Sequence, residues 1–158
     1  MHGLIFLELQ KFARQQAGAQ AWEILLRETR LPLKSYSVVS TYPDEDLLAL
    51  VGAASRLLNL PAAATLEAFG EFIAPELMRL HGRFLRLEWK TLDVIENTEQ
   101  LIHAVVRVGN GDAKPPVLDC IRTTPDELQL LYTPSAVCAA SPRGLSRASA
   151  ATLGRPSR

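Results

Sequence analysis

The sequence has no long uninterrupted run of apolar residues. None of its runs approaches the roughly 18 residues that a membrane-spanning helix needs. The apolar start at residues 4–7 meets a charge at Glu8, which is too early for the continuous apolar stretch of a signal peptide. We therefore expect a soluble, cytoplasmic protein that does not associate with a membrane.

Cysteine is scarce, because the chain has only Cys120 and Cys138. The two residues lack the Cys-x-x-Cys spacing of zinc and redox pairs. In a reducing cytoplasm, buried thiols are favoured over a disulfide or a zinc pair.

Net charge is also missing, since 17 basic residues balance 17 acidic ones. Nothing in the overall charge therefore favours a nucleic-acid partner. The balance is uneven along the chain: residues 134–158 carry four arginines and no Asp, Glu or Lys, which leaves residues 1–133 with a net charge of −4.

Known catalytic motifs are absent from the sequence. It has no glycine-rich phosphate loop, no Gly-x-Ser-x-Gly, no His-Glu-x-x-His and no cysteine with an evident catalytic partner. The acidic run Asp44-Glu45-Asp46 is better explained as the first turn of a helix, where carboxylates favour the positive end of the dipole. We therefore expect that the protein is not an enzyme.

What the sequence does have is helical periodicity over its first two thirds. A chain of 158 residues that is 47% hydrophobic is long and apolar enough for one domain with a sizeable core. Apolar residues recur at helical steps from Leu4 to Leu31, and Gly18 divides this stretch into two helices. Further helices are predicted from Asp44 to Asn59, from Pro61 to Pro75, where proline should end or kink the helix, and from Met78 to Leu87.

The longest uninterrupted helical pattern runs from Thr91 to Val108. It carries two apolar stripes, so we expect this helix to be buried on two sides. The stripes are Leu92, Ile95, Ile102 and Val106, and Val94, Leu101 and Val105.

A β-hairpin is predicted after this helix. Residues 117–122 and 128–132 have the composition of strands, and the segment 124–127 has the residues of a turn. No strand or helix period follows Pro134. The fold class is therefore α+β, with an N-terminal helical subdomain followed by an antiparallel sheet that is incomplete.

The three histidines differ in their surroundings. His2 lies at the chain end and His81 lies among arginines, so solvated surface positions are expected for both. His103 lies between apolar helix positions, where an imidazole must be hydrogen-bonded or ligated. The residues alone favour a satisfied core or boundary histidine. We find no second ligand at chelating spacing, which disfavours a protein-only metal site and leaves open a heme iron that needs one protein ligand.

Four features of the sequence occur together in one register. They are the opening Met1-His2-Gly3-Leu4-Ile5, the helical segment Glu96–His103, the pair Pro115-Pro116 twelve and thirteen positions after His103, and Tyr132 twenty-nine positions after it. In this arrangement the chain resembles the heme nitric oxide/oxygen-binding (H-NOX) domains, a family that also supplies the sensor domain of soluble guanylate cyclase.

The resemblance implies a set of roles for these residues. His103 would be the axial ligand of the iron of heme b, Pro116 would shape the porphyrin, and Tyr132 would reach a heme propionate. Ile5 and Leu77 would line the pocket. The protein would be a non-catalytic nitric oxide sensor in which loss of the bond from His103 to iron releases the helix of residues 91–108. Its effector would be a separate histidine kinase or cyclic-dinucleotide signalling enzyme.

The chain departs from the family just after Tyr132. The serine and arginine of the family's Tyr-x-Ser-x-Arg motif would fall at Pro134 and Ala136, whose side chains cannot hydrogen-bond a propionate. We therefore divide the chain into an H-NOX-like domain, residues 1–133, and an atypical tail, residues 134–158, that is either naturally disordered or read out of frame. The alternative function is a heme-free interaction module that has lost heme retention.

Overall fold

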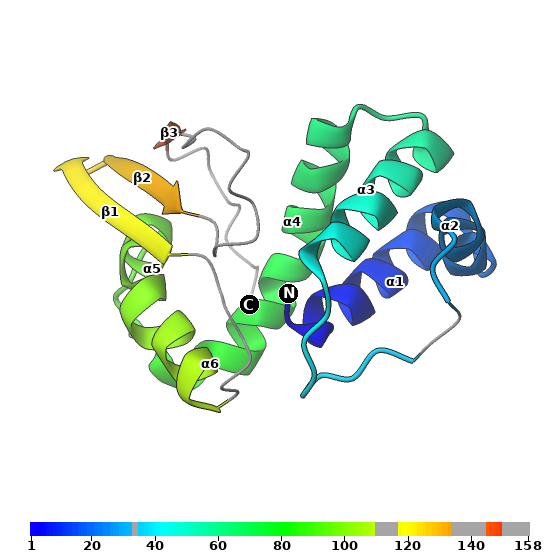
Figure 1. The fold of residues 1–158 in the computed structure, drawn as a ribbon. Coiled ribbons are helices and arrows are strands. Elements are labelled where there is room, and N and C mark those ends of the chain that lie inside the picture. The colour runs from blue at the N-terminus through cyan, green and yellow to red at the C-terminus, as the bar shows by residue number, and fades with distance from the viewer. Residues whose placement is uncertain (33–34, 110–116, 134–144, 150–158) are drawn as a thin grey trace. The chain divides into compact units, whose positions relative to one another are not determined.

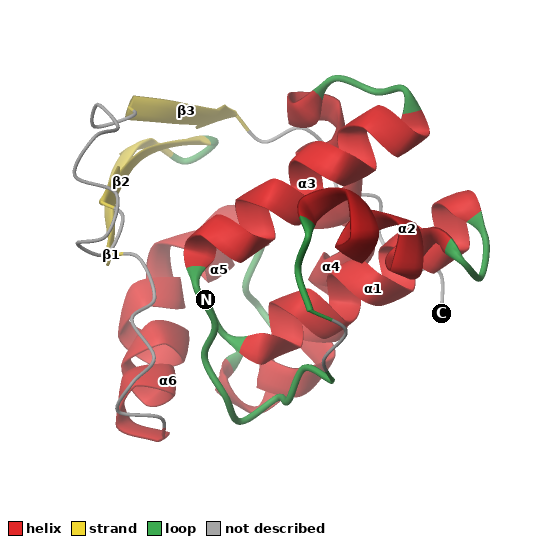
Figure 2. Ribbon diagram, turned by 45° about the vertical axis from the view of Figure 1, so that its right-hand side comes forward, coloured by secondary structure: helices red, strands yellow, loops and turns green. Residues whose placement is uncertain are grey.

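The computed structural model of the chain describes residues 1–32, 35–109, 117–133 and 145–149. It divides into two compact units, Met1–Leu80 and His81–Arg158 (Figure 1). The first unit is helical, and the second contains helices and an antiparallel sheet (Figure 2). The α+β prediction is therefore confirmed, whereas the division after residue 133 stays a prediction.

Four helices build the first unit. Gly18 ends the first helix with φ of +91°, a backbone conformation that suits glycine, and Asn59 ends the third with φ of +53°. Asp44, Glu45 and Asp46 form the first turn of the third helix, as predicted. The helices are α1 (Gly3–Ala17), α2 (Ala21–Thr29), α3 (Asp44–Leu58) and α4 (Ala62–His81).

The core of the first unit is rich in aromatic side chains. Phe6 is fully buried and stacks on Tyr36, with 4.5 Å between the ring centroids. Trp22 packs edge-on against Tyr36. The loop that contains Tyr36 passes so close to α1 that a Cβ atom on Gly3 would lie 2.0 Å from the carbonyl oxygen of Ser37. Glycine is therefore required at position 3 for this packing.

The sequence predicted that Pro75 ends or kinks its helix, and of these two outcomes the structure excludes the first. Helix α4 continues through it to His81, and the short 3-10 helix η1 (Gly82–Phe84) follows. A proline inside a helix removes one backbone hydrogen bond, and here the packing of Phe69 and Ile73 in the core holds the helix on the preceding turns.

The helix predicted over residues 91–108 is interrupted by a π-helical turn. It consists of α5 (Thr91–Thr98), the π turn η2 (Glu99–His103) and α6 (Ala104–Gly109). Hydrophobic periodicity did not reveal the interruption. One π turn adds only about one residue to the helical repeat, so the apolar residues before and after it still fit a single helical pattern.

The predicted hairpin is confirmed as β1 (Val117–Thr124) and β2 (Glu127–Thr133), which pair antiparallel. A third strand, β3 (Leu145–Ser149), pairs with β2, so the sheet order is β1-β2-β3. The expectation of no strand after Pro134 was therefore wrong. The strand was missed because Leu-Ser-Arg-Ala-Ser has a single large apolar residue.

Two-sided burial of the 91–108 helix is not observed. Leu92 is 5% exposed, but Ile95, Ile102 and Val106 of the same stripe are half-buried, and Val105 of the second stripe is 39% exposed. Within the described part of the second unit, only Leu92 and Leu128 are buried hydrophobic residues. Much apolar surface of this helix is therefore covered incompletely by protein.

No single helix in the described residues has the length and apolar character to cross a membrane. One bent pair, Asp44–Leu58 with Ala62–Phe84, meets the criteria of length and composition only when its two helices are taken together. Cys120 is a free, half-buried thiol, and Cys138 lies outside the described residues.

Candidate functional site

His103 is the last residue of the π turn η2. In this turn the backbone N–H of Ala104 donates to the carbonyl of Glu99, five residues earlier. The His103 side chain is 17% exposed, so it is shielded from water without being sealed in a core. Single π turns are rare and occur frequently at functional sites.

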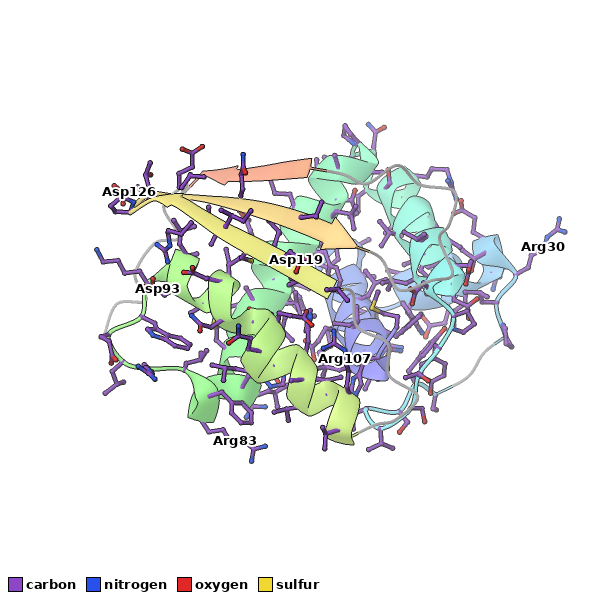
Figure 3. All side chains as sticks on the ribbon, turned by 60° about the vertical axis from the view of Figure 1, so that its left-hand side comes forward. Arg30, Arg83, Asp93, Arg107, Asp119 and Asp126 are labelled. Carbon is purple, nitrogen blue, oxygen red and sulfur yellow. The ribbon has the colours of Figure 1, made fainter. Side chains whose placement is uncertain are left out.

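The carboxylate of Glu99 gathers three partners from three segments. His103 Nδ1 lies 2.9 Å from Glu99 Oε2, and the backbone N–H of Leu118, in β1, donates to the same oxygen at 3.1 Å. Arg107 Nη2, on α6, lies 2.6 Å from Glu99 Oε1. Figure 3 labels Arg107 on this helix. We call these four residues, Glu99, His103, Arg107 and Leu118, the Glu99 cluster.

The electrostatics of the Glu99 cluster fix its proton positions. Burial alone would raise the pKa of Glu99, but the contacts from Arg107, His103 and the Leu118 N–H outweigh burial and lower that pKa. Glu99 is therefore ionised near neutral pH and can only accept hydrogen bonds. It follows that Nδ1 of His103 carries the proton in the neutral imidazole, so that Nε2 carries the lone pair.

The hairpin presents one face of β1 to the helix. Every second residue of β1 contacts the helical segment 91–103. These residues are Leu118, which contacts Glu99, Cys120, which contacts Ile95, and Arg122, which contacts Glu96. Cys120 Sγ donates to the carbonyl of Ile95 at 3.8 Å, and Arg122 Nη2 pairs with Glu96 Oε2 at 2.9 Å and with Asp93 Oδ1 at 2.5 Å. These contacts hold β1 along the helix that delivers His103.

The other predicted site residues fall in both units. Ile5 and Leu77 are half-buried in the first unit, and each packs against its aromatic core. Tyr132 lies in β2 of the second unit, where its backbone pairs with Leu118. The register therefore places Tyr132 next to the strand residue that binds Glu99. Pro116 lies outside the described residues.

The other two histidines are not the solvated residues that the sequence suggested. His2 is half-buried and caps α1, because its Nδ1 accepts the N–H of Leu4 at 3.4 Å. His81 is half-buried, and its ring lies 6.5 Å from that of Phe84. Burial, then the charge of Arg83 and then His103, lower the pKa of His81.

Glu99 is the residue that the sequence analysis missed. We counted no carboxylate at ligand spacing around His103, but Glu99 stands four residues earlier, on the same face of a helix. That spacing could have found it. Glu99 lies within the segment Glu96–His103 of the family resemblance but was given no role there. Arg107 stands four residues after His103, outside that segment.

No group of three or more His, Cys, Asp and Glu side chains in the described ranges is arranged to hold a metal ion by itself. None of the described residues bonds Nε2 of His103. The donor that this site offers is therefore one imidazole nitrogen, which suits a heme iron.

The Haem-NO-binding family model matches residues 2–147 of the chain. The fold is similar to that of an H-NOX protein from S. oneidensis in the Fe(II)NO state, with a TM-score of 0.73 and 22% identity, over 84% of this chain and 73% of that one. It is also similar to a mutant of an H-NOX protein from K. algicida in the unliganded Fe(II) state, with a TM-score of 0.71 and 21% identity, over 85% of this chain and 74% of that one.

A third similar structure is the H-NOX protein from Shewanella woodyi, bound to IWP-051 in the Fe(II)CO state. Its TM-score is 0.67 and its identity 24%, over 84% of this chain and 70% of that one. No curated protein matches the chain.

Proposed function

Since the chain belongs to the Haem-NO-binding (H-NOX) family of heme-based gas sensors, we propose that His103 is its axial iron ligand and that it senses nitric oxide. The observation that supports this proposal most directly is the state of His103. Its Nδ1 is bonded to Glu99, and none of the described residues bonds its Nε2. A half-buried imidazole that presents one nitrogen is the protein ligand that a heme iron needs.

The surroundings of His103 also fit a heme. Leu101, Ile102 and Val106 are half-buried, so this helix offers apolar surface that the described protein atoms do not fully cover. A porphyrin ring would cover that surface. Each Å² of apolar surface removed from water would contribute about 25 cal/mol to the free energy of heme binding.

Each further site residue has a proposed role. Ile5 and Leu77 would line the pocket, Pro116 would shape the porphyrin, and Tyr132 would hydrogen-bond a propionate. When bound, heme b supplies an iron site for a diatomic gas. We assign no tyrosine or other donor to the distal side, and this supports nitric oxide over a stable oxygen complex as the ligand.

The signal would reach another protein. The chain shows no motif of a catalytic output, so its proposed effector is a separate histidine kinase or cyclic-dinucleotide signalling enzyme. We place the protein in the cytoplasm, without a nucleic-acid or membrane partner. Glu99 contacts both His103 and the backbone of Leu118 in β1. A displacement of His103 would therefore shift or break the contact between Glu99 and β1.

One observation favours a second function. Pro134 and Ala136 stand where the family's Tyr-x-Ser-x-Arg motif has the serine and arginine that would hydrogen-bond the propionates. Tyr132 would remain as the sole residue of that motif. A chain that retains heme poorly would act instead as a heme-free interaction module.

Reconstitution with hemin, followed by reduction, separates these two functions. For the sensor we expect stoichiometric uptake and a Soret band that moves when nitric oxide is added. His103→Gly should abolish this behaviour, whereas the control His81→Gln, a half-buried histidine of the same unit, should keep it. No stoichiometric uptake by the wild-type chain would refute the sensor and favour the interaction module.

A further inference from the structure

Glu99 holds His103 in place, and it is itself held from two sides. Its side chain is 21% exposed, and its two oxygens face partners from α6 and β1 as well as His103. A carboxylate fixed by a guanidinium and a backbone N–H cannot change rotamer without losing both contacts. Glu99 is therefore a rigid acceptor for the imidazole.

The backbone of Glu99 makes a second contact with the segment that carries His103. Its carbonyl accepts the N–H of Ala104 across the π turn, while its carboxylate contacts the side chain of His103. Glu99 thus contacts the segment of His103 twice, through its backbone carbonyl in the π turn and through its carboxylate at the imidazole.

Accepting the proposed function as a premise, we propose that Glu99 is a positioning residue, which fixes the Nδ1–H tautomer of His103 and directs Nε2 to the iron. Without an acceptor at Nδ1, the ring would rotate more freely and would populate the other tautomer, whose Nε2 carries a proton and cannot ligate. A carboxylate on the far nitrogen also makes a ligating histidine more basic. Loss of such a contact typically weakens metal binding about 10–100-fold.

The chain offers a matched control for this contact. Glu96 lies on the same helix and also pairs with an arginine, Arg122, but it has no contact with His103. A change at Glu96 removes an ion pair between helix and hairpin and leaves the imidazole untouched. Glu99→Ala removes the acceptor, whereas Glu99→Gln keeps an acceptor oxygen without the charge.

The first measurement needs no heme. Nitrogen NMR of the full-length chain with labelled histidine should show His103 protonated at Nδ1 in the wild type, in Glu99→Gln and in Glu96→Ala. In Glu99→Ala the population should move toward the Nε2–H tautomer. A wild-type-like tautomer in Glu99→Ala would overturn the proposal. If Glu99→Ala does not fold, Glu99→Gln carries the test through the second measurement.

The second measurement uses the hemin-reconstituted, reduced chain. Heme affinity should fall about 10–100-fold in Glu99→Ala and by a smaller factor in Glu99→Gln, and the iron–histidine stretching band should move to lower frequency in both. Glu96→Ala should keep the wild-type values. Wild-type heme affinity and an unchanged band in Glu99→Ala would overturn the positioning role, and an unchanged band in Glu99→Gln would overturn the contribution of the carboxylate charge. If His103→Gly keeps the wild-type affinity and band, the axial-ligand proposal fails instead, while the tautomer result still reports on Glu99.

Discussion

The first unit buries an aromatic core of Phe6, Phe12, Trp22, Tyr36 and Phe69, whereas only Leu92 and Leu128 are buried hydrophobic residues in the described part of the second unit. Both units have amphipathic helices, but only the first covers their apolar faces with protein. In the second, polar contacts hold helix and hairpin together: the carboxylate of Glu99 accepts the backbone N–H of Leu118, and Arg122 pairs with Glu96. The comparison indicates that the first unit is stabilised by its own packing. The described residues of the second unit leave apolar surface uncovered, as expected if the proposed heme covers it.

The largest effect should come from truncating the core of the first unit. Phe6→Ala removes a ring that is 0% exposed and that stacks on Tyr36, and it should lower the free energy of unfolding by about 3–5 kcal/mol. Chemical denaturation followed by circular dichroism measures the change. The control Val38→Ala, at a side chain that is 49% exposed, should change stability by less than about 0.5 kcal/mol. If Phe6→Ala lowers the free energy of unfolding by less than about 1 kcal/mol, the first unit is not stabilised mainly by the packing of this core.

Heme should stabilise the second unit most and should change least the part of the first unit around α2, which holds none of the proposed pocket residues. At free heme about 100 times the dissociation constant, binding adds about 2.7 kcal/mol to the folded state. Hydrogen exchange should therefore slow most in η2 and β1, because His103 and Leu118 lie there. Equal slowing in the amides around Trp22 and Leu25, in α2, would contradict the contrast between the units.

High pH should act first on the core of the first unit. Burial, then the charges of Asp46 and Tyr42, raise the pKa of Tyr36 to about 12 from an ordinary value of 10. The folded state therefore keeps the Tyr36 proton where the unfolded state loses it, and stability falls as pH rises from 10 to about 12. The loss is on the order of 2 kcal/mol.

Tyr36→Phe should remove most of this dependence, since phenylalanine does not titrate. Unfolding free energies measured at pH 8 to 12 check the result. An equally steep loss of stability in Tyr36→Phe would contradict the assignment to this phenol.

The smallest effect should come from the ionic contacts of the second unit. Arg122→Met removes the pairs with Asp93 and Glu96 and should lower stability only slightly, because solvent screens such exposed pairs. The cost should shrink in high salt. The control Asp119→Ala, on the exposed face of β1 (Figure 3), should cost little. A cost for Asp119→Ala as large as that for Arg122→Met would contradict the one-sided contact of β1.

The sequence predicted the elements that local residues determine. Gly18 and Asn59 end helices, Asp44 begins one, and the hairpin follows from two strand-like segments around a turn. It left open whether the helix ends or kinks at Pro75. The helix α4 continues through this residue, and packing of its buried side chains supports it there. Strand β3 was missed because Leu145–Ser149 pairs through its backbone and has little apolar pattern.

The site was predictable in part. His103 and Tyr132 came from motif spacing, and the register of β1 and β2 links Tyr132 to the Glu99 cluster through Leu118. The third contact of Glu99 joins residues 19 positions apart, which no local pattern contains. The composition of the tail still allows a natural segment or an out-of-frame reading. Sequencing the locus tests the latter, which an intact frame that encodes these same residues in close relatives would exclude.

The most direct test of the central claim is imidazole rescue of His103→Gly. In this variant glycine leaves a space of the size of the lost ring, so free imidazole can replace the missing ligand. We predict that the reduced, hemin-reconstituted variant lacks the iron–histidine stretching band of the wild type, and that added imidazole restores both a ligand band and heme retention. A wild-type band in His103→Gly without imidazole would show that another residue holds the iron and would contradict the account.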